Sequence, residues 1–196
     1  TIQQLLEDPK LKGKVTMLSE MGDSLGLVMA DAGDDPASVT DESFDRAIQR
    51  VQAAVDSGQI RKFYGNDYGQ PLANGDLAAA VAWSGDVATL KADNPRLEWA
   101  VPEGGGIIWT DNMFIPTGGS VATASTYMNF VYDPRIAAQI AVGTGYISSV
   151  KGVREEAEKL DPEAASNTRI FPDDALLEQL HQNDPAMLDN DDYITR

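Results

Sequence analysis

The chain lacks cysteine altogether and has a single histidine, His181, among its 196 residues. Without cysteine it has no disulfide bond, thiolate metal site, iron–sulfur cluster or cysteine nucleophile. A Ser-His-Asp mechanism or a histidine metal site would have to use His181. That residue lies in a Leu-His-Gln-Asn-Asp stretch typical of the end of a surface helix. We therefore predict no catalytic residue, no metal site and no cofactor.

Positive charge is scarce, because 15 Lys and Arg residues face 31 Asp and Glu residues, for a net charge of −16. A chain this acidic repels nucleic acids and anionic membranes and attracts cations, so we predict no nucleic-acid partner. Long apolar runs are also missing, and none reaches the roughly 18 residues that span a bilayer. The first residue is Thr1 and no signal peptide is visible. We expect a piece of a longer protein, so a missing signal does not locate it.

Short apolar strands alternate with helix-like stretches along the chain, which is the pattern of an α/β fold. The clearest helix is predicted over Asp41–Ser57, with Thr40 as its cap and Gly58 at its end. Strands or extended segments are predicted at residues 14–18, in the last part of the apolar run 77–83, and at 97–101, 107–109 and 113–115. Further helices are predicted at about 24–32, 86–91, 120–132, 134–142 and 173–182.

Two stretches come close to known ligand motifs without matching them. Asp31–Glu42 imitates a calcium-binding loop, but Gly33 takes a ligand position and Pro36 takes the place of the turning glycine. Gly104–Gly106 matches neither the dinucleotide fingerprint nor the phosphate loop. We interpret the first as a loop before a capped helix and the second as a turn.

Carboxylates and tryptophans follow three of the predicted strands, at the places where open α/β sheets bind ligands. They are Glu20 and Asp23 after the first strand, Trp83 and Asp86 in a Trp-Ser-Gly-Asp run, and Trp109 and Asp111 after a glycine turn. Carboxylates pair with amine cations, and indole faces add cation–π attraction and cover methylene groups. Such a set suits a linear polyamine. The alternative is that the tryptophans belong to the core and the acids cap helices.

Several blocks resemble, in order and spacing, the spermidine/putrescine-binding proteins of ABC transporters. They are Leu72–Asp86 (LANGDLAAAVAWSGD), Val101–Pro116, Tyr127–Pro134 and Gly145–Tyr146, with a looser match over Lys12–Asp23. The resemblance implies a periplasmic-binding-protein type II fold, with two hinged α/β lobes and the ligand between them. Members of that family carry a long N-terminal segment that forms most of the first lobe, and we expect this chain to lack it.

The resemblance also implies a division of the chain and a set of site residues. Most of this chain, residues 1–109 and 151–196, would be the second lobe, and residues 110–150 would be a crossover segment that belongs to the first lobe. The implied ligand-binding residues are Glu20, Asp23, Trp83, Trp109, Asp111, Tyr146 and Gln182. Many relatives have Asp and then Glu where this chain has Glu20 and Asp23, which leaves the preferred amine spacing open.

The implied function is capture, outside the cytoplasm, of a polyamine that is handed to a membrane permease. The protein would be periplasmic or a cell-surface lipoprotein, and it would not be an enzyme. Its partners would be the polyamine, the permease and the missing N-terminal segment. The same fold binding an amino-acid-like amine, thiamine, an opine or iron stays open. So do a carboxylate-based hydrolase and an acidic interaction domain.

Overall fold

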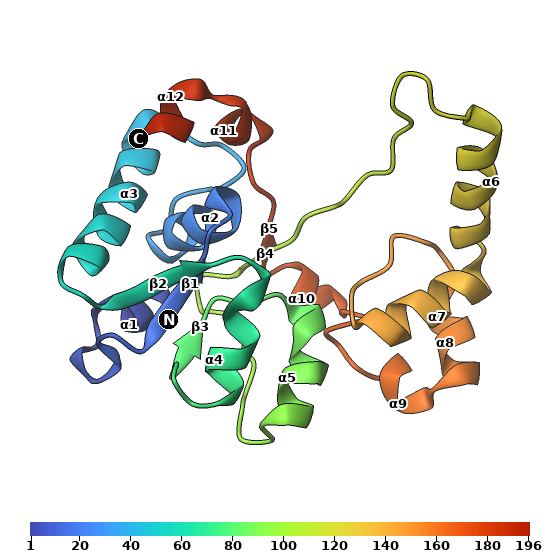
Figure 1. Ribbon diagram of the computed structural model, residues 1–196, viewed down its shortest axis with the longest axis horizontal. Coiled ribbons are helices and arrows are strands. Elements are labelled where there is room, and N and C mark those ends of the chain that lie inside the picture. Colours follow the sequence, from blue (N-terminus) through green and yellow to red (C-terminus); the bar gives the residue numbers. More distant parts are fainter. The chain divides into compact units, whose positions relative to one another are not determined.

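The computed structural model describes residues 1–196, which divide into two units (Figure 1). Unit 1 comprises Thr1–Trp83, Thr89–Trp109 and Gln179–Arg196, and unit 2 comprises Ser84–Ala88 and Thr110–Glu178. The predicted boundary after Trp109 coincides with a boundary between the units, and residues 151–178 lie in unit 2. The assignment of these segments to lobes of a longer protein stays a prediction.

Unit 1 is built on a three-stranded parallel sheet in the order β2-β1-β3. The strands are β1 (Val15–Leu18), β2 (Ile60–Tyr64) and β3 (Ala79–Ala80). Every residue of β1 is buried, as expected for the central strand of a parallel sheet. A second parallel pair joins β4 (Gly106–Ile107) to β5 (Leu180–His181), so the C-terminal segment pairs with the middle of the chain.

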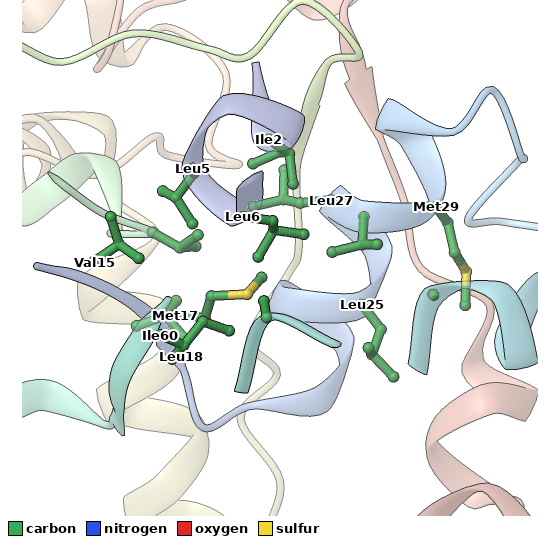
Figure 2. Packing of buried hydrophobic residues seen from close by; sticks show 14 of the residues in the cluster. Ile2, Leu5, Leu6, Val15, Met17, Leu18, Leu25, Leu27, Met29 and Ile60 are labelled. Atoms are coloured by element: carbon green, nitrogen blue, oxygen red, sulfur yellow. The ribbon is translucent and has the colours of Figure 1, made fainter. Parts of the chain in front are cut away.

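Helices surround these strands and close the core of unit 1. They are α1 (Ile2–Glu7), α2 (Met21–Asp31), α3 (Asp41–Asp56), α4 (Gly69–Ala73), α5 (Val87–Asp93, which begins in unit 2), α11 (Pro185–Asp189) and α12 (Asp191–Thr195). Figure 2 shows side chains of α1, β1 and α2 meeting in the core, with Leu6, Met17 and Leu27 among them. The prediction of α3 is confirmed, and the Thr40 hydroxyl accepts the Ser43 N–H as its cap.

Unit 2 consists of helices with a small core. The helices are α6 (Val121–Val131), α7 (Pro134–Thr144), α8 (Val153–Leu160), α9 (Pro162–Ala165) and α10 (Asp174–Leu177). The core consists of Ala137, Ala138, Ala141, Val153, Ala157, Ala165 and Ile170, from α7, α8, α9 and the turn that follows them. Helix α6 contributes no buried residue. No helix in the structure is long and apolar enough to cross a bilayer.

Some predicted elements differ from the observed ones. Residues 97–101 and 113–115 form no strand, and the predicted strand at 77–83 contributes only Ala79–Ala80 to the sheet. The helix predicted at 173–182 is the short α10 followed by β5. Pairing with Gly106–Ile107 draws His181 into a half-buried strand, so its placement at a surface helix end is wrong.

Candidate ligand-binding site

Glu20 and Asp23 lie where β1 gives way to α2. The turn is tight, because the Ser24 hydroxyl donates to the Leu18 carbonyl at 2.6 Å and the Ser19 N–H donates to the Tyr64 carbonyl at 2.8 Å. Asp23 therefore sits in the first turn of α2, where the unpaired N–H groups of the helix favour a negative charge. Both acidic residues occupy the carboxyl end of the central strand of the sheet.

Trp83 is held against Asp23 although 60 residues separate them in the sequence. The indole Nε1–H donates to Asp23 Oδ2 at 2.9 Å. The backbone N–H of Trp83 donates to the Tyr68 hydroxyl at 3.2 Å, and the two rings pack edge to face with centroids 6.1 Å apart. These contacts fix the orientation of the half-buried indole. The structure thus brings together Asp23 and Trp83, which the sequence placed after separate strands.

The electrostatic environment of Asp23 is unfavourable to its own charge. Burial raises the pKa of the Asp23 carboxyl, the hydrogen bond from Trp83 lowers it, and the charge of Glu20 raises it, with a net rise. No basic side chain contributes to this shift. Glu20 is exposed, and Ser19 Oγ donates to its Oε2 at 3.3 Å. The β1–α2 turn therefore carries two acidic groups with no internal cation beside them.

Unit 2 contains another acidic cluster, which consists of Asp86 and Asp111 near Tyr146. The Tyr146 hydroxyl lies 3.4 Å from Asp86 Oδ1, to which it donates. Its ring lies directly on Gly85, where an added Cβ would overlap the ring. Gly145 has a φ of 76°, and a Cβ there would meet the Gly85 carbonyl at 3.0 Å. Two glycines thus permit the close approach that seats Tyr146 beside Asp86.

Tyr146 is a protonated donor at neutral pH. Burial, the charge of Asp86 and its hydrogen bond, and then the charge of Asp111 raise the pKa of the Tyr146 phenol to about 12. Asp111 is exposed and close enough to contribute to that shift. The sequence places Asp86 in the Trp-Ser-Gly-Asp run, and the predicted set of ligand-binding residues does not include it. Its signal was its position three residues after Trp83.

Trp109 follows β4 and Gln182 follows β5, so both lie at the same end of this parallel pair. Ile107 pairs with His181, and the Ile108 N–H donates to the His181 carbonyl at 2.8 Å. Both Trp109 and Gln182 are exposed, Trp109 to 43%. His181 has a structural contact, since its Nε2 lies 3.0 Å from the Gly104 carbonyl oxygen.

The predicted site residues therefore fall into three groups. Unit 1 brings Glu20, Asp23 and Trp83 together and places Trp109 and Gln182 at the β4–β5 pair. Unit 2 holds Asp111 and Tyr146. Carboxylate oxygens and indole faces are suited to binding an organic cation. No group of three or more Asp, Glu or His side chains is arranged to hold a metal ion.

Comparison with known proteins gives three relevant similarities. A putrescine-binding periplasmic protein of Escherichia coli strain K12 is 26% identical over 120 residues, which are 58% of this chain and 32% of the relative. A structure assigned as a spermidine/putrescine ABC transporter from Listeria monocytogenes matches with a TM-score of 0.82 and 26% identity, over 96% of this chain and 58% of the other. A spermidine/putrescine ABC transporter substrate-binding protein of Streptococcus pneumoniae matches with a TM-score of 0.73 over 93% of this chain and 55% of the other.

The last structure is 20% identical and is similar in fold alone. The chain spans about a third of the length of the curated relative and somewhat more than half of the two structures. These similarities confirm the predicted periplasmic-binding-protein-like α/β fold. The family model of the bacterial extracellular solute-binding proteins matches residues 1–171. The chain belongs to the family of bacterial extracellular solute-binding proteins.

Proposed function

We propose that this chain is part of an extracytoplasmic protein that captures a polyamine and delivers it to the permease of an ABC transporter. The observation that carries the proposal is the Asp23–Trp83 pair. The Asp23 carboxylate accepts a hydrogen bond from the oriented Trp83 indole and has no basic side chain of the protein beside it. The names of the E. coli and Listeria relatives, both 26% identical, point to the same class of ligand.

The chemistry of the pair favours an alkylammonium ligand. An alkylamine with a pKa near 10.4 is cationic at neutral pH, and burying its charge is costly without a carboxylate partner. Asp23 Oδ2 accepts the indole N–H, which leaves further lone pairs of the carboxylate for an ammonium group. An indole face adds about 0.5–2 kcal/mol of cation–π attraction and covers methylenes.

A linear polyamine carries an ammonium group at each end, so it needs a second acidic group. Asp86 and Asp111, with Tyr146 as a donor that orients Asp86, form a second acidic cluster, within unit 2, that has the chemistry to bind an ammonium group. We assign Trp109 to a further aromatic wall and Gln182 to a polar contact of the same ligand. In the complete protein the ligand would lie in an acidic, tryptophan-lined cleft that closes when the lobes close.

Unit 2 supports a further part of the proposal, that a segment of the full-length protein outside these 196 residues completes the first lobe. Most of the exposed large apolar side chains belong to this unit, including Phe114 at 81%, Val121 and Phe130. Residues 112–132 contain no charged side chain. An uncharged, apolar exposed surface is typical of a protein core that has been divided.

The backbone of unit 2 supports the same conclusion. Residues 110–116 run extended toward α6 without joining a sheet (Figure 1). One face of α6 is an open surface made of Ala122, Thr123, Thr126, Tyr127 and Phe130. The Listeria structure has 42% of its length without a counterpart here, since 58% is covered.

The predicted crossover at 110–150 lies within unit 2. Because unit 2 continues to Glu178, we extend the crossover segment to that residue.

The test is calorimetric titration of the full-length protein with spermidine, putrescine, spermine, thiamine and ferric citrate. We expect micromolar binding of one polyamine, which corresponds to about −8 kcal/mol. Asp23→Asn is expected to weaken it by about 2 kcal/mol, roughly 30-fold, because one partner of a buried charge pair is lost. The matched control is Asp93→Asn, a change of the same type at an exposed position on α5.

The outcomes separate the alternatives. Tight binding of thiamine or iron without polyamine binding would retain the fold and replace the ligand. Absence of binding by the full-length protein to every compound in the panel would overturn the proposed function. Equal losses in Asp23→Asn and Asp93→Asn would show that net charge, and not the Asp23–Trp83 pair, attracts the ligand.

A further inference from the structure

The carboxamide of Asn183 fills a notch in helix α2. Gly22 and Gly26, four positions apart, leave one face of the helix without side chains. A Cβ added at Gly22 would lie 2.9 Å from Asn183 Nδ2, and a Cβ added at Gly26 would overlap Asn183 Oδ1. The same Cβ at Gly26 would also meet Ile107 Cδ1, of β4, at 3.0 Å. The two glycines therefore make room for this one planar side chain.

The Asn183 carboxamide in the notch does not stabilise the fold through a hydrogen bond of its oxygen. Asn183 Oδ1 is buried and has no hydrogen-bond partner. A buried acceptor without a partner destabilises a folded protein, whereas an apolar side chain of similar volume avoids that cost. A planar carboxamide is thinner than a branched apolar side chain, so it lets the C-terminal segment approach α2 closely. The notch thus fixes a short separation between two elements.

Those two elements carry residues of the candidate site. Asp23 follows Gly22 directly on α2, and Gln182 directly precedes Asn183 after β5. Successive side chains of an extended segment point to opposite sides. Seating Asn183 on α2 therefore leaves Gln182 exposed, as observed. The next residue is anchored too, since the Asp184 N–H donates to the Pro36 carbonyl at 2.8 Å and its Oδ2 accepts the Val39 N–H at 3.3 Å.

We infer that Asn183 is a positioning residue, which sets the separation between Asp23 on α2 and Gln182 after β5. Asn183 and the two glycines thereby fix where Gln182 stands relative to Asp23, and we assign both of these unit 1 residues to the same ligand. The inference rests on the proposed polyamine-binding function. It assigns to Asn183 and the two glycines of α2 a role in selectivity between short and long polyamines, without contact with the ligand.

The first test needs no ligand and uses thermal unfolding of the full-length protein. Gly26→Ala is expected to lower the Tm, because the new methyl group displaces the carboxamide. Adding Asn183→Ala to Gly26→Ala should recover a large part of that loss. The control pair combines Asn183→Ala with Gly143→Ala, a position on α7 with no atom within 4 Å of an added Cβ, and should be additive. Additive effects in the Gly26 pair would overturn the notch geometry.

The second test measures the Kd of putrescine and of spermidine by calorimetry. Asn183→Ala and Asn183→Leu are expected to change the ratio of the two constants at least threefold. Asn190→Ala, which removes the cap of α12, serves as a destabilising control that should leave the ratio unchanged. An unchanged ratio in the Asn183 variants, with the wild type binding both amines, would overturn the positioning role alone. Failure of the wild type to bind any polyamine would overturn the proposed function and this inference with it.

Discussion

At the scale of single residues, Asp23 combines a cost to stability with a proposed role in binding. Its raised pKa means that the folded protein binds its proton more tightly than the unfolded chain does. Stability from this group is therefore present below the usual pKa of an aspartate and is lost as the pH rises through the raised value. Above that raised pKa the ionised carboxylate destabilises the fold.

Asp23→Asn is therefore expected to raise the Tm of the ligand-free protein at pH 7 while it weakens polyamine binding. The gain should stay below about 1 kcal/mol, because the carboxylate is half exposed and screened by solvent. This corresponds to a Tm increase of about 2–4 °C or less. Unfolding scans at pH 7 and pH 3 test the sign, since the gain should disappear at pH 3. A lower Tm at pH 7 would contradict it.

Tyr146 gives a prediction at alkaline pH. Its phenol has a pKa of about 12 in the folded protein, above the ordinary value of 10. The unfolded chain therefore loses this proton first, and stability should fall as the pH rises from about 10 to 12. Tyr146→Phe removes this part of the decline. Denaturant unfolding at pH 8 and pH 11 measures it, with Tyr132→Phe, an exposed tyrosine of unit 2, as the control.

The sequence predicted which residue types surround the candidate site but not which of them touch. The sequence placed Asp23 and Trp83 after separate strands, at the strand ends where open α/β sheets bind ligands. The bond between the Trp83 indole and the Asp23 carboxylate depends on the Tyr68 hydroxyl and ring, which orient the indole. Contacts over such distances in the sequence leave no local pattern. The pairing of Asp86 with Tyr146 was missed for the same reason.

At the scale of elements, the turn at Ser84–Asp86 packs against the segment after α7 because Gly85 and Gly145 have no side chains to separate them. Gly85→Ala is expected to displace the Tyr146 ring and destabilise the protein by about 1–3 kcal/mol, as overpacking does. In Tm this is a loss of about 3–10 °C. Differential scanning calorimetry measures it.

The matched control for Gly85→Ala is Gly143→Ala, which lies within α7 in open space. Alanine has the higher helix propensity, so this variant should keep or raise the Tm. A Tm for Gly85→Ala that equals the wild type would show that Tyr146 does not rest on the glycine backbone.

The elements that the sequence predicted well have strong local signals. The helix α3 has a capping threonine and a regular apolar stripe, and β1 is a short buried strand before a helix. The strand β2 was missed because it lies at the edge of its sheet, with Arg61 and Lys62 exposed, and so lacks an apolar pattern. Its parallel pairing with β1 is a tertiary effect. The same holds for β5, whose two residues pair with β4.

At the scale of the whole molecule, the two units differ in how well they bury apolar surface. The core of unit 1 includes large side chains such as Met17, Phe44 and Tyr68, all almost fully buried. The core of unit 2 is mainly alanine, and α6 lies outside it. A core of small residues buries little apolar area per residue and contributes little stability. This contrast is the physical reason for expecting a further segment over unit 2.

Phe130→Ser tests that expectation by a difference in its effect on stability between two forms of the protein. In the 196-residue chain Phe130 is exposed to 57%, so the substitution should leave the Tm nearly unchanged and reduce the binding of a hydrophobic dye. In the full-length protein the same ring would be buried, and its loss should cost about 3–5 kcal/mol. Parallel scans of both forms, with Leu188→Ser on α11 of unit 1 as the control, measure the difference. Equal, small effects in both forms would mean that no further segment covers α6.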